Sequence, residues 1–332
     1  MHVISHADLT TWLDHLAQTR TLIAPRDVEG VLLYRPVRSS AEVMCDYTRP
    51  VLSVKEALFP ATERLLTIEK TGQTIMLDET LYEGEQVIFG VRPCDARGVK
   101  ALDALFIETE PVDTAYAARR AHTTLVGLAC KAMGETCFCT SVGGAPDDPS
   151  GMDVMLTEVA DGYAVEAVTE KGAALLNGVA LRDAPGAPPK PILREASPVP
   201  DAPAWPPQFN DAYWADMAER CLSCRICAYV CPTCRCFDVR DEALPSQNGN
   251  SRYARIRCWD SCASEAYRRI AGGHNPRPTK GDRLRNRFFC KFYYYPRQYG
   301  PVACTGCGRC IDSCPVNIDI TEVLQHMAEV TL

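Results

Sequence analysis

Two runs of cysteine dominate the chemistry available to this chain. Each run places four thiols within eleven residues and ends on a proline. Thiolates are ligands for zinc and for iron–sulfur clusters. Zinc sites usually use cysteine pairs separated by a longer spacer, so the dense spacing favours clusters. The runs read Cys221-Leu-Ser-Cys224-Arg-Ile-Cys227-Ala-Tyr-Val-Cys231-Pro232 and Cys304-Thr-Gly-Cys307-Gly-Arg-Cys310-Ile-Asp-Ser-Cys314-Pro315.

Both runs follow the pattern C-x2-C-x2-C-x3-C-P, which is typical of bacterial ferredoxins that carry two clusters. Three cysteines at intervals of three wrap a tight loop around one cube, and backbone N–H groups in the loop can bond to sulfur. The proline stops the loop, so the fourth cysteine points to the other cube. The pattern therefore predicts two [4Fe–4S] clusters, one held by Cys221, Cys224, Cys227 and Cys314 and the other by Cys304, Cys307, Cys310 and Cys231.

Four further cysteines lie in the N-terminal half, where two of them end expected buried strands. Cys94 and Cys130 follow these strands, and Cys137 and Cys139 lie in the next loop. Parallel strands bring such ends to one edge of a sheet. We therefore expect Cys94, Cys130, Cys137 and Cys139 to hold a third [4Fe–4S] cluster. The alternative is four buried or loop thiols that act as small hydrophobic side chains.

The remaining cysteines have no such spacing. Cys45 stands alone and is expected to be a buried thiol. The others lie in or near the segment between the two runs, and the sequence leaves open whether they are structural or bind metal. They are Cys234, Cys236, Cys258, Cys262 and Cys290.

Composition and charge restrict the class of protein. The 332 residues include 18 cysteines, and the chain shows neither a signal peptide nor a long apolar run. We therefore expect a cytoplasmic protein with reduced thiols, not bound to a membrane. The net charge of −7 argues against a nucleic-acid partner, although residues 251–300 hold twelve Lys and Arg against three acids, which is a local charge of +9. These cations either form a solvated face, surround anionic clusters or dock an acidic partner.

Strand and helix patterns must position these cysteines. Residues 86–95 and 123–130 read as buried strands, 97–107 as a helix and 152–170 as a hairpin. We predict an α/β domain with a mixed sheet over residues 1–182. A linker with nine prolines follows over 183–208.

The C-terminal part is predicted to be a mainly α-helical, ferredoxin-type domain over residues 209–332 with two clusters. A helix is expected to begin after Asn210 or Asp211 and run into the first cysteine run. Between the runs lies a long insertion, for which we predict helices over 263–270 and 282–289. A closing helix is expected over 318–330.

Several phrases resemble one family, the iron–sulfur β subunit of cytoplasmic [NiFe] sulfhydrogenases, with the A subunit of anaerobic sulfite reductase as a more distant match. The resemblance spans most of the chain. The phrases are FGVRPCDARG (89–98), LACKAMGETCFCTSVGG (128–144), CPTCRCF (231–237), WDSC (259–262), AGGHNPRPTKGDRLRNR (271–287) and CGRCIDSCPVNIDI (307–320).

The resemblance implies an electron-transfer subunit of an NADP-linked complex. Its partners would be a flavin/NAD(P)-binding subunit and a catalytic metal subunit, so this chain would hold clusters but no catalytic residues. In keeping with that, the sequence has no G-x-G-x-x-G, P-loop or G-x-S-x-G motif. Two alternatives remain at this point: the equivalent subunit of an anaerobic sulfite reductase, and an iron–sulfur regulator that binds nucleic acid through its basic segment.

Overall fold

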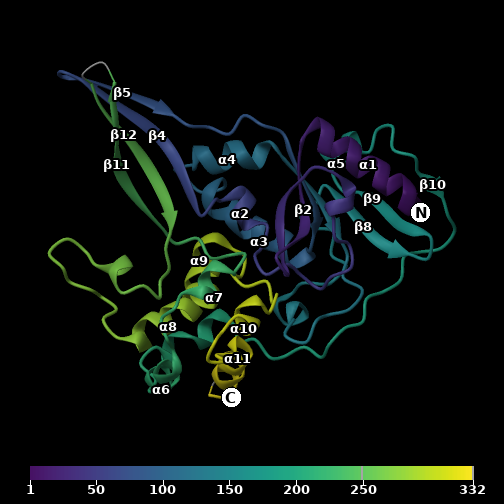
Figure 1. Ribbon diagram of the computed structural model, residues 1–332. Coiled ribbons are helices and arrows are strands. Elements are labelled where there is room, and N and C mark those ends of the chain that lie inside the picture. Colours follow the sequence, from purple (N-terminus) through teal and green to yellow (C-terminus); the bar gives the residue numbers. More distant parts are fainter. Residues whose placement is uncertain (248–249, 331–332) are drawn as a thin grey trace.

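The computed structural model describes residues 1–247 and 250–330 (Figure 1). The strands are β1 (His2–Ser5), β2 (Thr21–Val28), β3 (Val31–Val37), β4 (Thr62–Thr71), β5 (Thr74–Glu79), β6 (Gln86–Val91), β7 (Thr123–Leu128), β8 (Val154–Val159), β9 (Gly162–Ala167), β10 (Arg182–Asp183), β11 (Phe237–Gln247) and β12 (Asn250–Trp259). The helices are α1 (His6–Thr19), α2 (Lys55–Leu58), α3 (Pro93–Phe106), α4 (Thr114–Ala121), α5 (Glu170–Leu175), α6 (Tyr213–Arg220), α7 (Ile226–Tyr229), α8 (Lys280–Phe289), α9 (Tyr295–Tyr299), α10 (Arg309–Asp312) and α11 (Ile320–Glu329).

The N-terminal part is an eight-stranded mixed sheet with helices on both faces, which confirms the expected α/β class. Its strand order is β10-β1-β9-β8-β7-β6-β2-β3, and the four central strands β8, β7, β6 and β2 run parallel. Helix α1 buries Trp12 and Leu16 in the core on one face. Helix α3 buries Val99 and Leu102 on the other. The hairpin expected over 152–170 is present as β8 and β9.

A second sheet joins segments from both sides of the linker. Its order is β11-β12-β4-β5, all antiparallel, and it projects from the rest of the molecule as an arm (Figure 1). At its base, Arg257 on β12 is 1% exposed, and its Nε donates to Glu63 Oε1 on β4 at 2.9 Å. Arg119 from α4 donates to the other oxygen of the same carboxylate at 2.9 Å. This buried ion pair fixes the arm to the α/β part.

The linker is extended apart from two short 3-10 turns, and its end is anchored by Trp205, which is fully buried. The Trp205 ring stacks on Phe292 with ring centroids 5.3 Å apart. Beyond it, α6, α8 and α11 enclose a third core with Trp214, Phe288 and Leu324. The helices expected over 282–289 and 318–330 are therefore present, as α8 and α11.

The insertion between the cysteine runs differs from the prediction in two ways. Its first half is the β-hairpin of β11 and β12, so the C-terminal part is not mainly helical over this stretch. The predicted helix over 263–270 is wrong, because only a single 3-10 turn forms at Ala266–Arg268. Ile270 at the end of that segment is 57% exposed, so the segment has no buried apolar stripe with which a helix could dock.

Among the residues that the structure describes, no helix is long and apolar enough to cross a membrane.

Candidate metal centres

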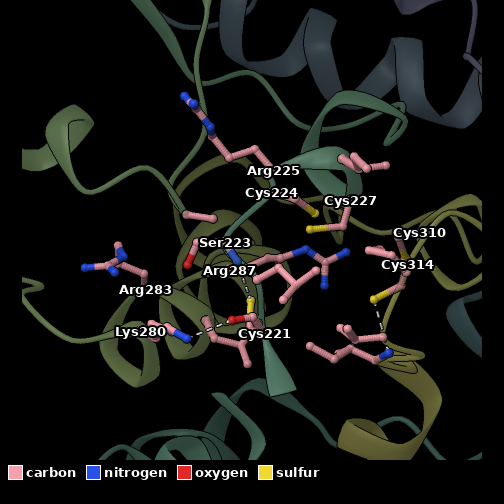
Figure 2. A pocket seen from close by; sticks show the side chains of 17 residues that line it. Cys221, Ser223, Cys224, Arg225, Cys227, Lys280, Arg283, Arg287, Cys310 and Cys314 are labelled. Carbon is pink, nitrogen blue, oxygen red and sulfur yellow. Dashed lines mark hydrogen bonds between the residues drawn. The ribbon is translucent and has the colours of Figure 1, made fainter. Parts of the chain in front are cut away.

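The first cysteine run lies around a cavity at the surface of the C-terminal part (Figure 2). Two backbone amides already point at sulfur: Ser223 N–H donates to Cys221 Sγ at 3.4 Å, and Ile318 N–H donates to Cys314 Sγ at 3.2 Å. Such bonds stabilise the negative charge of a ligated thiolate. The structure thus brings Cys314, from the second run, to the first loop. The cysteines that line the cavity are Cys221, Cys224, Cys227, Cys310 and Cys314.

The two loops share one backbone shape although their residues differ. Each has a left-handed residue before its second cysteine and another directly after it. In the second loop these are Gly306 (φ 64°) and Gly308 (φ 75°), and in the first they are Ser223 (φ 53°) and Arg225 (φ 68°). Glycine is required at 306 because a Cβ there would lie 2.5 Å from the Phe138 carbonyl oxygen. The second loop is therefore packed against the α/β part, whereas the first tolerates side chains because it faces outward.

The second run begins in the interior, where Cys304 and Cys307 are buried, and a buried lysine lies beside it. Lys291 is 3% exposed, and its Nζ donates to Cys231 Sγ at 3.1 Å. A hydrogen bond from Cys234 and the charge of Lys291 lower the pKa of Cys231 well below its ordinary value. Burial raises the pKa of Cys304 to about 11, although Lys291 acts in the opposite direction. Each of Cys304, Cys307 and Cys310 interacts electrostatically with Cys231, the thiol predicted to complete their set.

The four N-terminal cysteines meet where β6 and β7 end. These strands are parallel neighbours, as the sequence prediction required. Arg92 joins their ends, since its Nη1 donates to the carbonyl oxygens of Leu128 at 3.0 Å and Ala129 at 2.8 Å. Arg49 Nη1 donates to Cys137 Sγ at 3.1 Å. The cavity between them is lined by Cys94, Cys130, Cys137, Cys139 and also Cys307 of the second run.

A buried ion pair holds this N-terminal cavity against the second run. Asp95 directly follows Cys94, and Arg309 directly precedes Cys310. Arg309 donates to both oxygens of Asp95, at 2.6 and 2.8 Å, and its Nε donates to the Pro50 carbonyl at 2.9 Å. Burial disfavours the charge, but the Asp95 carboxylate raises the pKa of Arg309 well above its ordinary value.

Buried guanidinium atoms without a hydrogen-bond partner indicate that the cavities suit an anionic group. Arg287 is 4% exposed, and its Nε and Nη2 have no partner although it lines the first cavity beside Cys227 (Figure 2). Arg97 Nη1 is likewise unpaired, and its charge acts on Cys139. A cube with four thiolates carries net negative charge and acceptor sulfurs, so the residues present fit such a cluster.

Within residues 1–247 and 250–330, no three His, Cys, Asp or Glu side chains form a group that could hold a single metal ion. The thiols instead stand around cavities, as described above.

Sequence reasoning missed the cations that accompany the thiols. Arg92, Lys291 and Arg309 are buried and bonded beside cysteines, but no local pattern marks them. For Arg92 a usable signal was its position between a buried strand and Cys94. An arginine buried there would need hydrogen-bond acceptors, which indicates a structural role beside the cysteine. Cys45 lies beside Tyr163 next to the core of the large sheet; it shares a neighbouring cavity with Cys130 and Arg92 but does not line the one that holds Cys94, Cys137 and Cys139.

Comparison with known proteins agrees with this geometry. A family model described as a 4Fe–4S dicluster domain matches residues 220–318. The chain is 33% identical to the sulfhydrogenase 2 subunit beta of Pyrococcus furiosus over 335 aligned positions, which cover 96% of this chain and 95% of that protein. No solved structure matches. The chain belongs to the family of sulfhydrogenase β subunits.

Proposed function

We propose that this chain relays electrons through [4Fe–4S] clusters between a flavin/NAD(P)-binding subunit and the catalytic metal subunit of a cytoplasmic [NiFe] hydrogenase. One observation carries the proposal: the second cysteine run touches both of its neighbours. Cys310 lines the surface cavity of the first run, and Cys307 lines the N-terminal cavity. The site of the second run therefore lies between the site of the first run and the N-terminal site, and three neighbouring clusters would form a path for electrons.

The ligand sets of the proposal follow the cavities. Crossed ligation is supported by the position of Cys314 in the first cavity and by the interactions of Cys231 with the second run. The proposed sets are Cys221, Cys224, Cys227 and Cys314; Cys304, Cys307, Cys310 and Cys231; and Cys94, Cys130, Cys137 and Cys139. When bound, each cluster supplies reversible one-electron transfer, and the protein supplies burial, N–H donors and cations that tune its potential.

The first cluster offers the contact with a partner subunit. Leu222 in its loop is 61% exposed and Ile226 is 38% exposed, next to the cationic side chains of Arg225 and Lys280. An apolar centre with a basic rim suits a protein partner with acidic residues around its own electron-transfer site. The second cluster is enclosed by the second loop, so electrons would leave the chain through the first.

A dye assay tests the carrier role. The anaerobically purified chain, reduced with dithionite, should pass electrons to oxidised viologens. It should not take up hydrogen, reduce sulfite or reduce NADP until the partner subunits are added. Turnover of any of these three reactions by the chain alone would contradict the proposal.

The N-terminal cluster is tested separately. Cys139→Ala should lose about four iron atoms per chain, because it removes one of four thiols around the cavity. Cys45→Ala is the matched control, since Cys45 lies outside the cavity. If both variants keep the iron content of the unmodified chain, the N-terminal cysteines are structural and only the two ferredoxin-type sites remain.

A further inference from the structure

A fourth group of cysteines gathers near Cys231, outside the sets assigned above. Cys234 and Cys236 lie in the loop between α7 and β11. Cys262 follows the end of β12, and Cys290 follows α8 at the start of a π-helical turn over Cys290–Tyr294. Three segments that are far apart in the sequence thus each deliver thiols to one place.

Contacts show that these thiols share a site. The backbone N–H of Asp260, two residues before Cys262, donates to the Cys236 carbonyl at 2.9 Å, and the Cys236 and Cys262 thiols interact with each other. Cys262 is 6% exposed and interacts electrostatically with Cys234 and Cys290. Four of the five cysteines left open by the sequence therefore converge.

Cations surround this group as they do the other sites. Arg235 Nη2 donates to Cys290 Sγ at 3.5 Å, and its guanidinium is held over the Tyr295 ring at 4.0 Å. Arg268 acts on Cys236, and its buried Nε has no hydrogen-bond partner. Arg277 lies within electrostatic reach of Cys262 and Cys290. An orphaned guanidinium nitrogen beside thiols is the feature that also marks the first and the N-terminal cavities.

The group repeats the composition of the N-terminal site. Each has one C-x-C pair, Cys137-Phe-Cys139 or Cys234-Arg-Cys236, and two single cysteines from other segments. Each also has an arginine that donates to a thiol. In contrast, Cys258, four residues before Cys262, receives a hydrogen bond from the Thr62 hydroxyl at 3.7 Å on the neighbouring strand.

We propose that Cys234, Cys236, Cys262 and Cys290 hold a further [4Fe–4S] cluster, next to the cluster of the second run. Four cysteine ligands are the usual set for such a cube. The adjacency is direct, because Lys291 Nζ donates both to Cys231 at 3.1 Å and to Cys234 at 3.6 Å. This inference rests on the proposed function only in assuming that the chain is loaded with clusters. The fourth cluster would add a branch to the proposed electron path, at the end of β11 and β12 where the arm joins the rest of the molecule.

Iron content of the full chain tests the inference. The chain is purified anaerobically and reconstituted with iron and sulfide, and iron and acid-labile sulfide are then measured per chain. Cys262→Ala and Cys236→Ala should each lose about four iron atoms, together with one component of the low-temperature EPR spectrum of the reduced protein. Cys258→Ala, the matched control on β12, should keep both its iron and the full EPR spectrum.

Two further variants keep the result decisive. Cys290 follows helix α8 and so reaches the site from a different segment than Cys262. Cys290→Ser therefore replaces Cys262→Ala if far-UV circular dichroism shows that Cys262→Ala does not fold. Cys221→Ala should lose the iron of the first cluster. If Cys221→Ala loses iron while the Cys236, Cys262 and Cys290 variants lose no more than Cys258→Ala, the fourth cluster is refuted and the proposed function stands. If Cys221→Ala also keeps all its iron, both fail.

Discussion

The ion pair between Asp95 and Arg309 provides the sharpest test of how the two halves of the chain are joined. Asp95 is 0% exposed and Arg309 is 2% exposed, and two charge-assisted hydrogen bonds of 2.6 and 2.8 Å connect them. Arg309→Met keeps much of the side-chain volume but leaves the carboxylate buried beside the Tyr34 hydroxyl at 3.4 Å. Removing one partner of a buried pair costs about 3–5 kcal/mol.

The assay is anaerobic thermal unfolding at one fixed scan rate, followed by circular dichroism and by the visible absorption of the clusters. At roughly 2 °C per kcal/mol for a long chain, the midpoint for Arg309→Met should fall by roughly 6–10 °C. Asp95→Asn combined with Arg309→Met should recover part of this loss, because the stranded charge is gone.

The control is Arg255→Met, which removes an exposed pair that is also bidentate, because Nε and Nη2 of Arg255 donate to the two oxygens of Asp241 at 2.8 and 2.8 Å. Exposed pairs contribute little to stability, so this midpoint should hardly change. The reasoning is refuted if Arg309→Met lowers the midpoint no more than Arg255→Met does.

Three further predictions concern the cysteine loops. Gly306→Ala should destabilise the protein by at least ~1–2 kcal/mol and release iron from the N-terminal site, because its Cβ meets the Phe138 carbonyl at 2.5 Å. Ser223→Gly, at the equivalent left-handed position of the first loop, should leave the iron content unchanged and raise the unfolding midpoint. If Ser223→Gly instead loses iron while Gly306→Ala keeps it, the conclusion that only the second loop requires glycine is wrong. Cys231→Ser should disturb the cluster of the second run and Cys314→Ser that of the first, as resolved by EPR, and damage confined to each variant's own run would disprove crossed ligation. Lys291→Met removes a buried charged donor worth about 1.5–3 kcal/mol, so the potential of the second cluster should fall by roughly 60–130 mV in an EPR-monitored titration. Lys280 is the control, because among the described residues its ammonium bonds only the Cys221 carbonyl. Lys280→Met should therefore shift the potential of the first cluster less than Lys291→Met shifts that of the second.

Local patterns were sufficient to predict the elements that carry most of the thiols. The apolar runs that became β6 and β7 placed Cys94 and Cys130 at one sheet edge, because parallel strands end together. Helices were also expected over 282–289 and 318–330, and α8 and α11 form there. The cysteine spacing also predicted that Cys314 would lie beside the first loop, and Cys314 lines the same cavity as Cys221 and Cys224.

Contacts between distant segments could not be predicted in this way. Asp95 and Arg309 are 214 residues apart, and neither lies in a pattern that names its partner. The ribbon of β11 and β12 is a different case, since the sequence Asn248-Gly249 between two alternating runs is a strong hairpin signal that the expectation of a helical frame overlooked. The gathering of Cys262 and Cys290 with Cys236 depends on that ribbon, so it was hidden for the same reason.

The sheet shared by β4, β5, β11 and β12 also constrains how the protein is made. The ribosome releases β4 and β5 long before β11 and β12, so Thr62 can pair with Cys258 only after the chain has emerged through residue 258 of 332. Until then β4 presents an unpaired edge, which is a template for association with other chains. The cysteine pair at 234 and 236 directly precedes the late strands. If these cysteines hold the proposed fourth cluster, iron and sulfide delivered before β11 and β12 pair would meet them without Cys262 beside them, so the arm would have to fold before that cluster could be completed.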